Sequence, residues 1–290
     1  MSLYLYGVTH WPVEPGADEP KARGAKSARG KQNPSKTAAK AGRKAGRGAE
    51  ARINFGPGVG DPQRTVEFVR HRDLAALVSD VAPAAIGSGQ GVRGLRRDMK
   101  AHANVLNSAA ALGVTVLPVQ FGVILPDPDA LVGRLLEPQQ RAMKGLLTRL
   151  QGCVELTFRA QYLEAQALQE VVAESPQLAR AAASLRARPS SAAYQAKIEL
   201  GKRVAEELQA RRDRDGGWLL HALAPVARDL KVKTPGNELV VLNASFLVPR
   251  QGVDKFDAAL AEVAEATKGR MALDCVGPLP PYSFVDLRIA

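Results

Sequence analysis

The chain has 290 residues, of which 46% are hydrophobic, and a formal net charge of +11. This length allows one large or two modest domains with a buried core. The longest apolar runs are too short and too interrupted by Pro, Gln and Gly to span a bilayer. The first ten residues lack the basic start and apolar stretch of a secretory signal. The sequence therefore predicts a cytoplasmic protein without a membrane span.

The positive charge is concentrated in one segment. Ten cations and no acidic residue lie between positions 21 and 49, and they account for nearly all of the net charge. Such a segment predicts weak, salt-sensitive binding of polyanions, but it contains no aromatic residue for base stacking, which favours a solvated loop. The candidate anion-binding residues are Lys21, Arg23, Lys26, Arg29, Lys31, Lys36, Lys40, Arg43, Lys44 and Arg47.

The first half of the chain alternates between strand and helix patterns. Residues 9 to 62 carry few large apolar side chains, so they predict a disordered insert that interrupts a domain already begun by the strand 1–8. One face of a helix over 95–112 carries Leu95, Met99, His102, Leu106 and Ala109, and Gly113 ends it. The other predicted elements are strands at 64–70, 74–81, 114–125 (with a turn at Phe121-Gly122) and 154–160, and a helix from Asp127 or Asp129 to Leu150.

The second half begins with a long helical region. Residues 161–233 are Ala-rich and charged with helical periodicity, and breaks fall at Pro176, Pro189 and Gly216-Gly217. They predict one or two helical hairpins, followed by a strand at 238–248, a helix at 253–268 and strands at 270–276 and 284–289. The predicted class is α+β, with a ferredoxin-like variant over 1–160 and a C-terminal domain, helices followed by strands, over 161–290.

Few residues suggest catalysis. The sequence GQGVRG at 89–94 matches a dinucleotide-binding pattern, but seven residues separate it from the preceding strand and no acidic residue follows on the next strand. The four histidines never lie at metal-ligand spacing. His102 lies on the apolar side of its helix, so it is interpreted as a hydrogen-bonded core or interface residue. Cys153 and Cys275 are interpreted as buried small hydrophobes. The sequence thus predicts no catalytic residue, no metal and no cofactor.

Three segments together resemble the gas vesicle protein F and L family (GvpF/GvpL). They are LYLYGV with the later RDLAALVSDV, then HANVLNSAAALGVTVLPVQFGVILPD (102–127), and finally VVLNASFLVPRQGVDKF with GPLPPYSFV (277–285). Two positions depart from the family pattern: Gln120 stands where a cation is usual, and Leu279 where Trp is usual. The motif positions that the resemblance marks as structural or interaction residues are Leu117, Pro118, Phe121, Gly122, Gly277, Pro278, Pro280, Pro281, Tyr282, Ser283 and Phe284.

The resemblance implies a non-enzymatic protein that helps to build gas vesicles, the air-filled protein shells that give microbial cells buoyancy. Its implied partners are the shell protein and other gas vesicle accessory proteins, with no membrane and no specific nucleic acid. Two alternatives come from the residues themselves: a nucleic-acid-associated protein that uses the basic segment 21–49, and a nucleotide-binding enzyme that uses GQGVRG.

Overall fold

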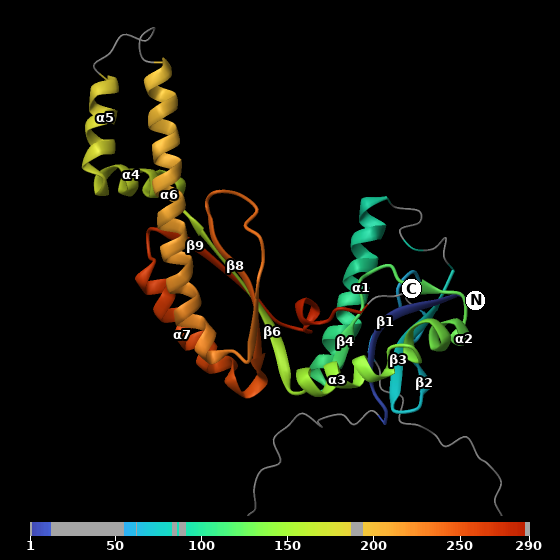
Figure 1. Cartoon of the computed structure of the whole chain (residues 1–290). Helices are drawn as coiled ribbons and strands as arrows, with labels where there is room; N and C mark the ends of the chain where they lie inside the picture. The colour runs from blue at the N-terminus through green and yellow to red at the C-terminus, as the bar shows by residue number, and fades with distance from the viewer. Residues whose placement is uncertain are drawn as a thin grey trace, which may run out of the picture.

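A computed structural model describes residues 2–12, 55–61, 63–82, 86, 91–186 and 194–287. The ten predicted anion-binding cations between 21 and 47 and the start of GQGVRG lie outside these residues. The described chain forms two antiparallel sheets, each packed against helices (Figure 1). The predicted α+β class is therefore confirmed.

The first sheet is built around its first strand, β1. β1 lies between β3 on one side and β4 and β5 on the other, and the strand order is β2-β3-β1-β4. Alternate β1 side chains point to opposite faces, so Leu3 and Leu5 pack in one hydrophobic cluster and Tyr4 and Tyr6 in another. The strands are β1 (Ser2–His10), β2 (Glu67–His71), β3 (Leu74–Val81), β4 (Val116–Pro118) and β5 (Ile124–Leu125).

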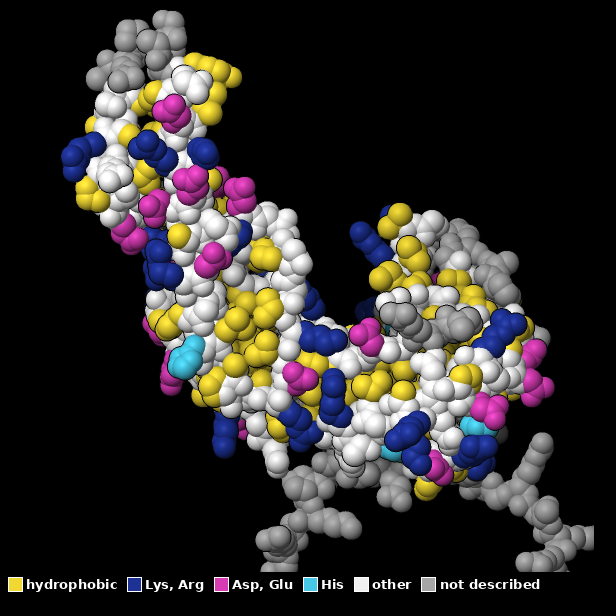
Figure 2. Space-filling view, in the orientation of Figure 1, with side chains coloured by type: hydrophobic (Ala, Val, Ile, Leu, Met, Phe, Trp, Pro, Cys, Tyr) yellow, Lys and Arg dark blue, Asp and Glu magenta, His cyan; other side chains and the backbone are white. Residues whose placement is uncertain are grey.

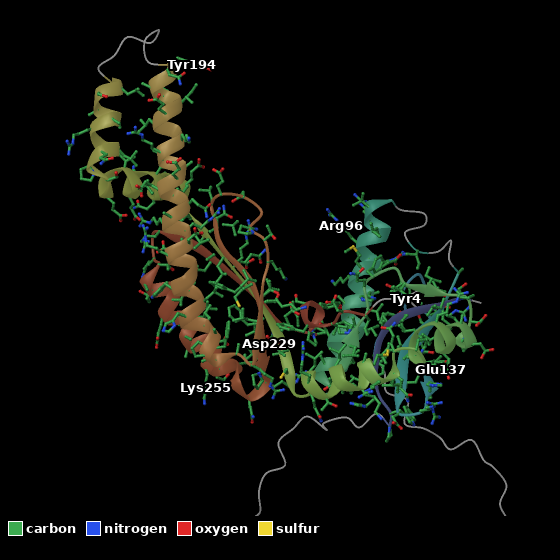
Figure 3. The ribbon with its side chains drawn as sticks, viewed as in Figure 1. Tyr4, Arg96, Glu137, Tyr194, Asp229 and Lys255 are labelled. Atoms are coloured by element: carbon green, nitrogen blue, oxygen red, sulfur yellow. The ribbon has the colours of Figure 1, made fainter. Side chains whose placement is uncertain are left out.

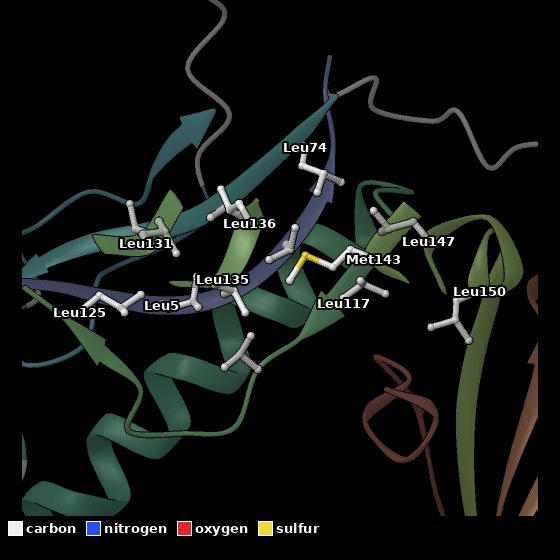
Figure 4. Packing of buried hydrophobic residues seen from close by; sticks show 14 of the residues in the cluster. Leu5, Leu74, Leu117, Leu125, Leu131, Leu135, Leu136, Met143, Leu147 and Leu150 are labelled. Atoms are coloured by element: carbon white, nitrogen blue, oxygen red, sulfur yellow. The ribbon is translucent and has the colours of Figure 1, made fainter. Parts of the chain in front are cut away.

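Helices cover both faces of this sheet. The face of Leu5 is covered by leucines and a methionine of the segment 128–150, shown close by in Figure 4, and the face of Tyr6 by α1. Asp127 caps α2 by accepting a hydrogen bond from the Ala130 amide at 2.7 Å, as predicted. The helices are α1 (Val92–Ala111), α2 (Pro128–Leu131), the π-helix η2 (Val132–Leu136) and α3 (Gln140–Leu150).

The second sheet has the order β7-β8-β6-β9 and packs one face against α6 and α7. Its strands are β6 (Cys153–Tyr162), β7 (Asp229–Val232), β8 (Val240–Pro249) and β9 (Met271–Leu279). Its helices are α4 (Glu164–Glu174), α5 (Pro176–Arg186), α6 (Tyr194–Leu223), α7 (Val253–Ala266) and the short 3₁₀ turns η3 (Ala224–Val226), η4 (Arg250–Gly252) and η5 (Tyr282–Phe284).

Both sheets share one topology. In each, the third strand along the chain lies between the first and the second, the fourth lies on the other side of the first, and all neighbours are antiparallel. A helix joins the third strand to the fourth in each case, α1 in the first half and α7 in the second. This is the strand order of ferredoxin-like folds, so the sequence prediction of that topology for the first half extends to the second.

Several predicted boundaries need correction. The strand predicted at 154–160 belongs to the second sheet, because β6 pairs with β8 and β9. Residues 229–232, predicted as helix, form β7. The predicted strand 114–125 divides into β4 and β5 around the turn at Phe121-Gly122.

Two further predictions are wrong at the ends of segments. Within the predicted disordered insert, Phe55 and Val59 are buried at 1% and 0% exposure and close the core beside α1. The strand predicted at 284–289 is not formed in its described part, where η5 ends at Phe284 and residues 285–287 are irregular; residues 288 and 289 lie outside the described chain.

The two halves lie side by side, and a helical arm of α4, α5 and the first part of α6 projects from the second half (Figure 1). The N-terminal part of α1 projects from the first half, and Figure 2 shows a hollow surface between the two projections. At the base of this hollow, the η5 turn lies next to α1 (Figure 1). The described residues contain no helix with the length and apolar character needed to cross a membrane.

Candidate functional site at the junction of the two sheets

The family motif VLPVQFG (116–122) forms the connection between β4 and β5. Leu117 and Pro118 are buried in β4, and Phe121 and Gly122 form the turn. Gly122 adopts a φ of 97°, which side chains with a Cβ rarely adopt. Its amide donates a hydrogen bond to the Tyr4 hydroxyl at 3.1 Å. The motif therefore fixes a turn against the aromatic face of β1.

A cluster of rings lies under this turn, between β1 and α1. His102 stacks on Tyr6 with ring centroids 5.6 Å apart and meets the edge of Phe121 at 5.8 Å. Because the Tyr4 hydroxyl accepts from Gly122, its proton is available for His102 Nδ1 at 3.0 Å. Burial lowers the pKa of His102 to about 4, although the Val119 backbone opposes the shift. His102 is thus a neutral, hydrogen-bonded core residue, as the sequence indicated.

The family motif GPLPPYSFV (277–285) begins at a close approach of β9 to β6. A Cβ on Gly277 would lie 2.5 Å from Leu156 Cδ2 and 2.8 Å from the Glu155 carbonyl oxygen, and the φ of Gly277 is 155°. Only glycine fits this approach. The Gly277-Pro278 peptide bond is cis, and Leu279 then pairs with Glu155.

A buried carboxylate holds the motif in place. Glu155 is 2% exposed and accepts hydrogen bonds from the Ser283 amide at 2.7 Å and the Ser283 hydroxyl at 2.5 Å. Ser245 and Thr157 extend the network, with Ser245 Oγ 2.9 Å from Ser283 Oγ and 3.3 Å from Thr157 Oγ1. Hydrogen bonds to a charged acceptor of this kind are among the stronger ones in proteins.

The motif then joins the two halves. Phe284 is 1% exposed and packs in the hydrophobic cluster that contains Leu3 and Leu5 of the first sheet and Leu247 of the second. Pro280 and Pro281 are buried beside a cavity of only about 10 Å³, lined also by α1, β4, β6 and Arg250. The Arg250 guanidinium crosses the junction and donates to the Ala110 carbonyl at 2.6 Å.

The motif positions differ in exposure. Leu117, Pro118, Pro280, Pro281 and Phe284 are buried, whereas Gly122, Gly277, Pro278 and Tyr282 are exposed, Tyr282 at 37%. Burial and the neighbouring Glu155 raise the pKa of the Tyr282 hydroxyl to about 12, so it stays protonated at neutral pH. A cavity of the size found here holds at most a single water.

A charged cluster lies at the base of the helical arm and was not predicted from the sequence. Arg211 of α6, only 7% exposed, pairs with Glu170 of α4 and lies 3.7 Å from Asp215, and Arg270 binds the same two carboxylates at 3.3 and 3.1 Å. The Tyr162 hydroxyl also donates to Asp215 at 2.6 Å. These ion pairs connect α4 and α6 to Arg270, which directly precedes β9, so the cluster holds the arm on the sheet. Only the Arg211/Asp215 spacing of four residues was visible in the sequence.

Other predicted features are placed as follows. Cys153 is buried and Cys275 half-buried, and no disulfide joins them. In the described part of the chain, no three His, Cys, Asp or Glu residues gather as metal ligands would. Of GQGVRG, Gly91 precedes α1 and Gly94 is buried within it.

The sequence matches gas vesicle proteins along most of its length. The family model described as "Gas vesicle synthesis protein GvpL/GvpF" matches residues 2–286. The chain is 38% identical to gas vesicle protein F of Streptomyces sp. (strain CB03234) over 79% of this chain and 91% of that protein. It is 24% identical to gas vesicle protein F of Dolichospermum flosaquae over 66% and 78% of the two chains.

The fold also matches crystal structures of gas vesicle protein GvpF. The TM-score is 0.72 for the Anabaena sp. PCC7120 protein and 0.67 for the Microcystis aeruginosa protein, each at 18% identity and with 99% of both chains covered. The match along nearly the whole chain, together with the motifs that build its junction, shows that the chain belongs to the gas vesicle GvpL/GvpF family, whose members are structural or accessory proteins of gas vesicles.

Proposed function

We propose that this accessory protein acts in assembly of the gas vesicle shell, in the cytoplasm, through contacts with the shell protein and with other accessory proteins. The observation that carries the proposal is the exposed apolar surface on its projecting helices. Val92, Leu95 and Met99 on α1 are between 42% and 66% exposed. Tyr194 and Ile198 in the first two turns of α6 are 71% and 50% exposed. Exposed apolar side chains gathered on projecting elements are typical of protein-binding surfaces.

The shape of the molecule supports the same proposal. The α1 projection and the helical arm lie on opposite sides of a hollow (Figure 2). A groove or helix face of this kind suits recognition of another protein's helix or strand. The polycationic segment 21–49 gives the competing hypothesis, a role in nucleic acid binding.

A co-purification experiment tests the proposal. The tagged chain is expressed in gas vesicle-producing cells, and recovery of each gas vesicle protein is quantified by mass spectrometry. We expect the shell protein or other accessory proteins to be enriched, and this enrichment to survive nuclease treatment and deletion of residues 13–54. Recovery of nucleic acid alone, lost with the same deletion, would instead support the competing hypothesis.

A further inference from the structure

The N-terminal half of α1 presents an apolar stripe to solvent. Val92, Leu95 and Met99 are 66%, 42% and 50% exposed. Their spacing of three and four residues aligns them along one side of the helix. The helical periodicity places Leu95 and Met99 on the same apolar face as Leu106, which is fully buried. The stripe therefore continues the core face of α1 beyond the edge of the sheet that it covers.

The same half of α1 is densely positive. Arg93, Arg96, Arg97 and Lys100 are all exposed, and the first turn has no acidic residue. Asp98 is 1% exposed and lies 3.0 Å from Arg97. Cations near a helix N-terminus interact unfavourably with the helix dipole. Folding of α1 therefore gives no reason for Arg93, Arg96 and Lys100.

The stripe and its cations border the hollow between the two halves. Arg96 projects from α1 toward the second half in Figure 3. Farther along α1, Leu106 and Ala110 line the junction cavity together with Pro280 and Pro281. Tyr282 follows them in η5, which lies beside α1 with the ring half-exposed. We name this surface the α1 ridge and define it by Val92, Arg93, Leu95, Arg96, Met99, Lys100 and Tyr282.

We infer that the α1 ridge binds an acidic amphipathic segment of another protein. The apolar side of that segment packs on the stripe and Tyr282, and its Asp or Glu side chains pair with the flanking Arg and Lys residues. The inference rests on the proposed function, because it names the surface and the chemistry by which assembly contacts are made. Charge complementarity selects the occupant, since a basic or neutral segment would leave the cations of the ridge unpaired.

Other occupants fit less well. A bilayer is flat on this scale and would cover the tip of α1 but not Tyr282 at the base of the hollow. Nucleic acid would satisfy the cations but leave the apolar stripe in contact with charged phosphates. A second copy that presented the same surface would bring like charges together.

Fluorescence anisotropy with two labelled peptides tests the inference. Both are helices of about five turns with the same Leu and Val stripe, one flanked by Glu and the other by Lys. We expect the full chain to bind the Glu peptide at least about tenfold more tightly at low salt, since a few exposed ion pairs together supply that ratio. The preference should shrink as salt is added.

Two variants locate the surface. The triple variant R93E/R96E/K100E should reverse the peptide preference without lowering the unfolding midpoint, because acidic residues suit the start of a helix. The control K197E/K202E/R203E makes the same charge change at exposed positions of α6 and should keep the preference. The variant L95S/M99S should weaken Glu-peptide binding about tenfold or more with its unfolding midpoint unchanged, since both side chains are exposed.

Four results would overturn the inference: equal binding of the two peptides, loss of the preference in the α6 control, binding to phosphatidylglycerol vesicles without peptide binding, or dimerisation through the ridge in place of peptide binding. The assay uses purified chain, so it is independent of vesicle formation. A chain that binds the Glu peptide but recovers no gas vesicle protein from cells would retain the surface and lose the proposed function. A chain that recovers gas vesicle proteins from cells but does not bind the Glu peptide would place the assembly contacts on another surface.

Discussion

At the scale of single residues, two positions show how buried polar and backbone requirements fix the junction. His102 is 3% exposed within a ring cluster, and Gly277 lies where β9 touches β6. Packing explains both the buried imidazole of His102 and the lack of a side chain at Gly277.

His102 should make the protein sensitive to mild acid. Its pKa is about 4 in the folded chain and near 6.5 in the unfolded chain, so the unfolded state binds a proton first as the pH falls. The free energy of unfolding should therefore be unaffected by this group above pH 6.5 and fall by roughly 3 kcal/mol between pH 6.5 and 4. Urea unfolding at several pH values measures this change.

The variant His102→Gln is the control, because an amide can hydrogen-bond Tyr4 but does not titrate. The dependence of its unfolding free energy on pH between 6.5 and 4.5 should be much shallower than that of the wild type. The same slope in both proteins would show that another group is responsible.

Gly277→Ala should destabilise the junction. The added methyl group would meet Leu156 and the Glu155 carbonyl at less than 3 Å, which costs about 1–3 kcal/mol in a packed core. Gly217→Ala is a matched substitution in α6, where no atom lies within 4 Å of the new Cβ, and it should stabilise the helix by about 0.5–1 kcal/mol. Thermal denaturation of both variants checks the sign of each change, and a neutral Gly277→Ala would contradict the described close approach.

At the scale of elements, the sequence predicted where strands and helices form better than it predicted which of them pair or pack together. The apolar pattern of β6 predicted a strand, but period-two alternation does not specify which sheet a strand joins. The same limit applies to α1, where the periodicity that buries Leu106 also runs through exposed Leu95 and Met99. Periodicity predicts which face of the helix is apolar. The length of the sheet that covers this face decides how much of it is buried.

The candidate site was predictable in part. The motifs GPLPPYSF and VLPVQFG were identified from their residues, and both lie at the junction. Their physical roles required tertiary contacts, because Ser283 bonds Glu155 across 128 positions of the chain. The charged cluster under the arm was invisible for the same reason, since Arg270 and Glu170 are 100 positions apart.

The position of the helical arm should depend on Arg211. This side chain connects α6 to α4 at 7% exposure. Arg211→Met leaves Arg270 as the remaining cationic partner of Glu170 and Asp215, so the loss should cost about 1–3 kcal/mol. Lys202→Met on the same helix removes an exposed pair with Glu206 at 4.0 Å and should change stability by less than about 0.5 kcal/mol. Hydrogen exchange should show faster exchange in α4 and α5 of the Arg211 variant only, and equal protection in both variants would contradict the role of the cluster.

At the scale of the whole molecule, two sheets of the same topology are joined by a C-terminal motif that packs into both. The α1 ridge and the helical arm lie on opposite sides of the hollow (Figure 2). A scaffold with exposed apolar projections is suited to contacts with other proteins. The family membership and this shape together support a role in building the gas vesicle shell.

The most direct test of this role is the number of gas vesicles per cell, counted by electron microscopy, in a producing strain that lacks the gene. Re-expression of the wild-type chain and of R93E/R96E/K100E at equal protein levels completes the comparison. We predict that the deletion strain makes few or no normal vesicles, that the wild-type chain restores them, and that the triple variant restores fewer. Normal vesicle numbers in the deletion strain would contradict the proposed assembly function.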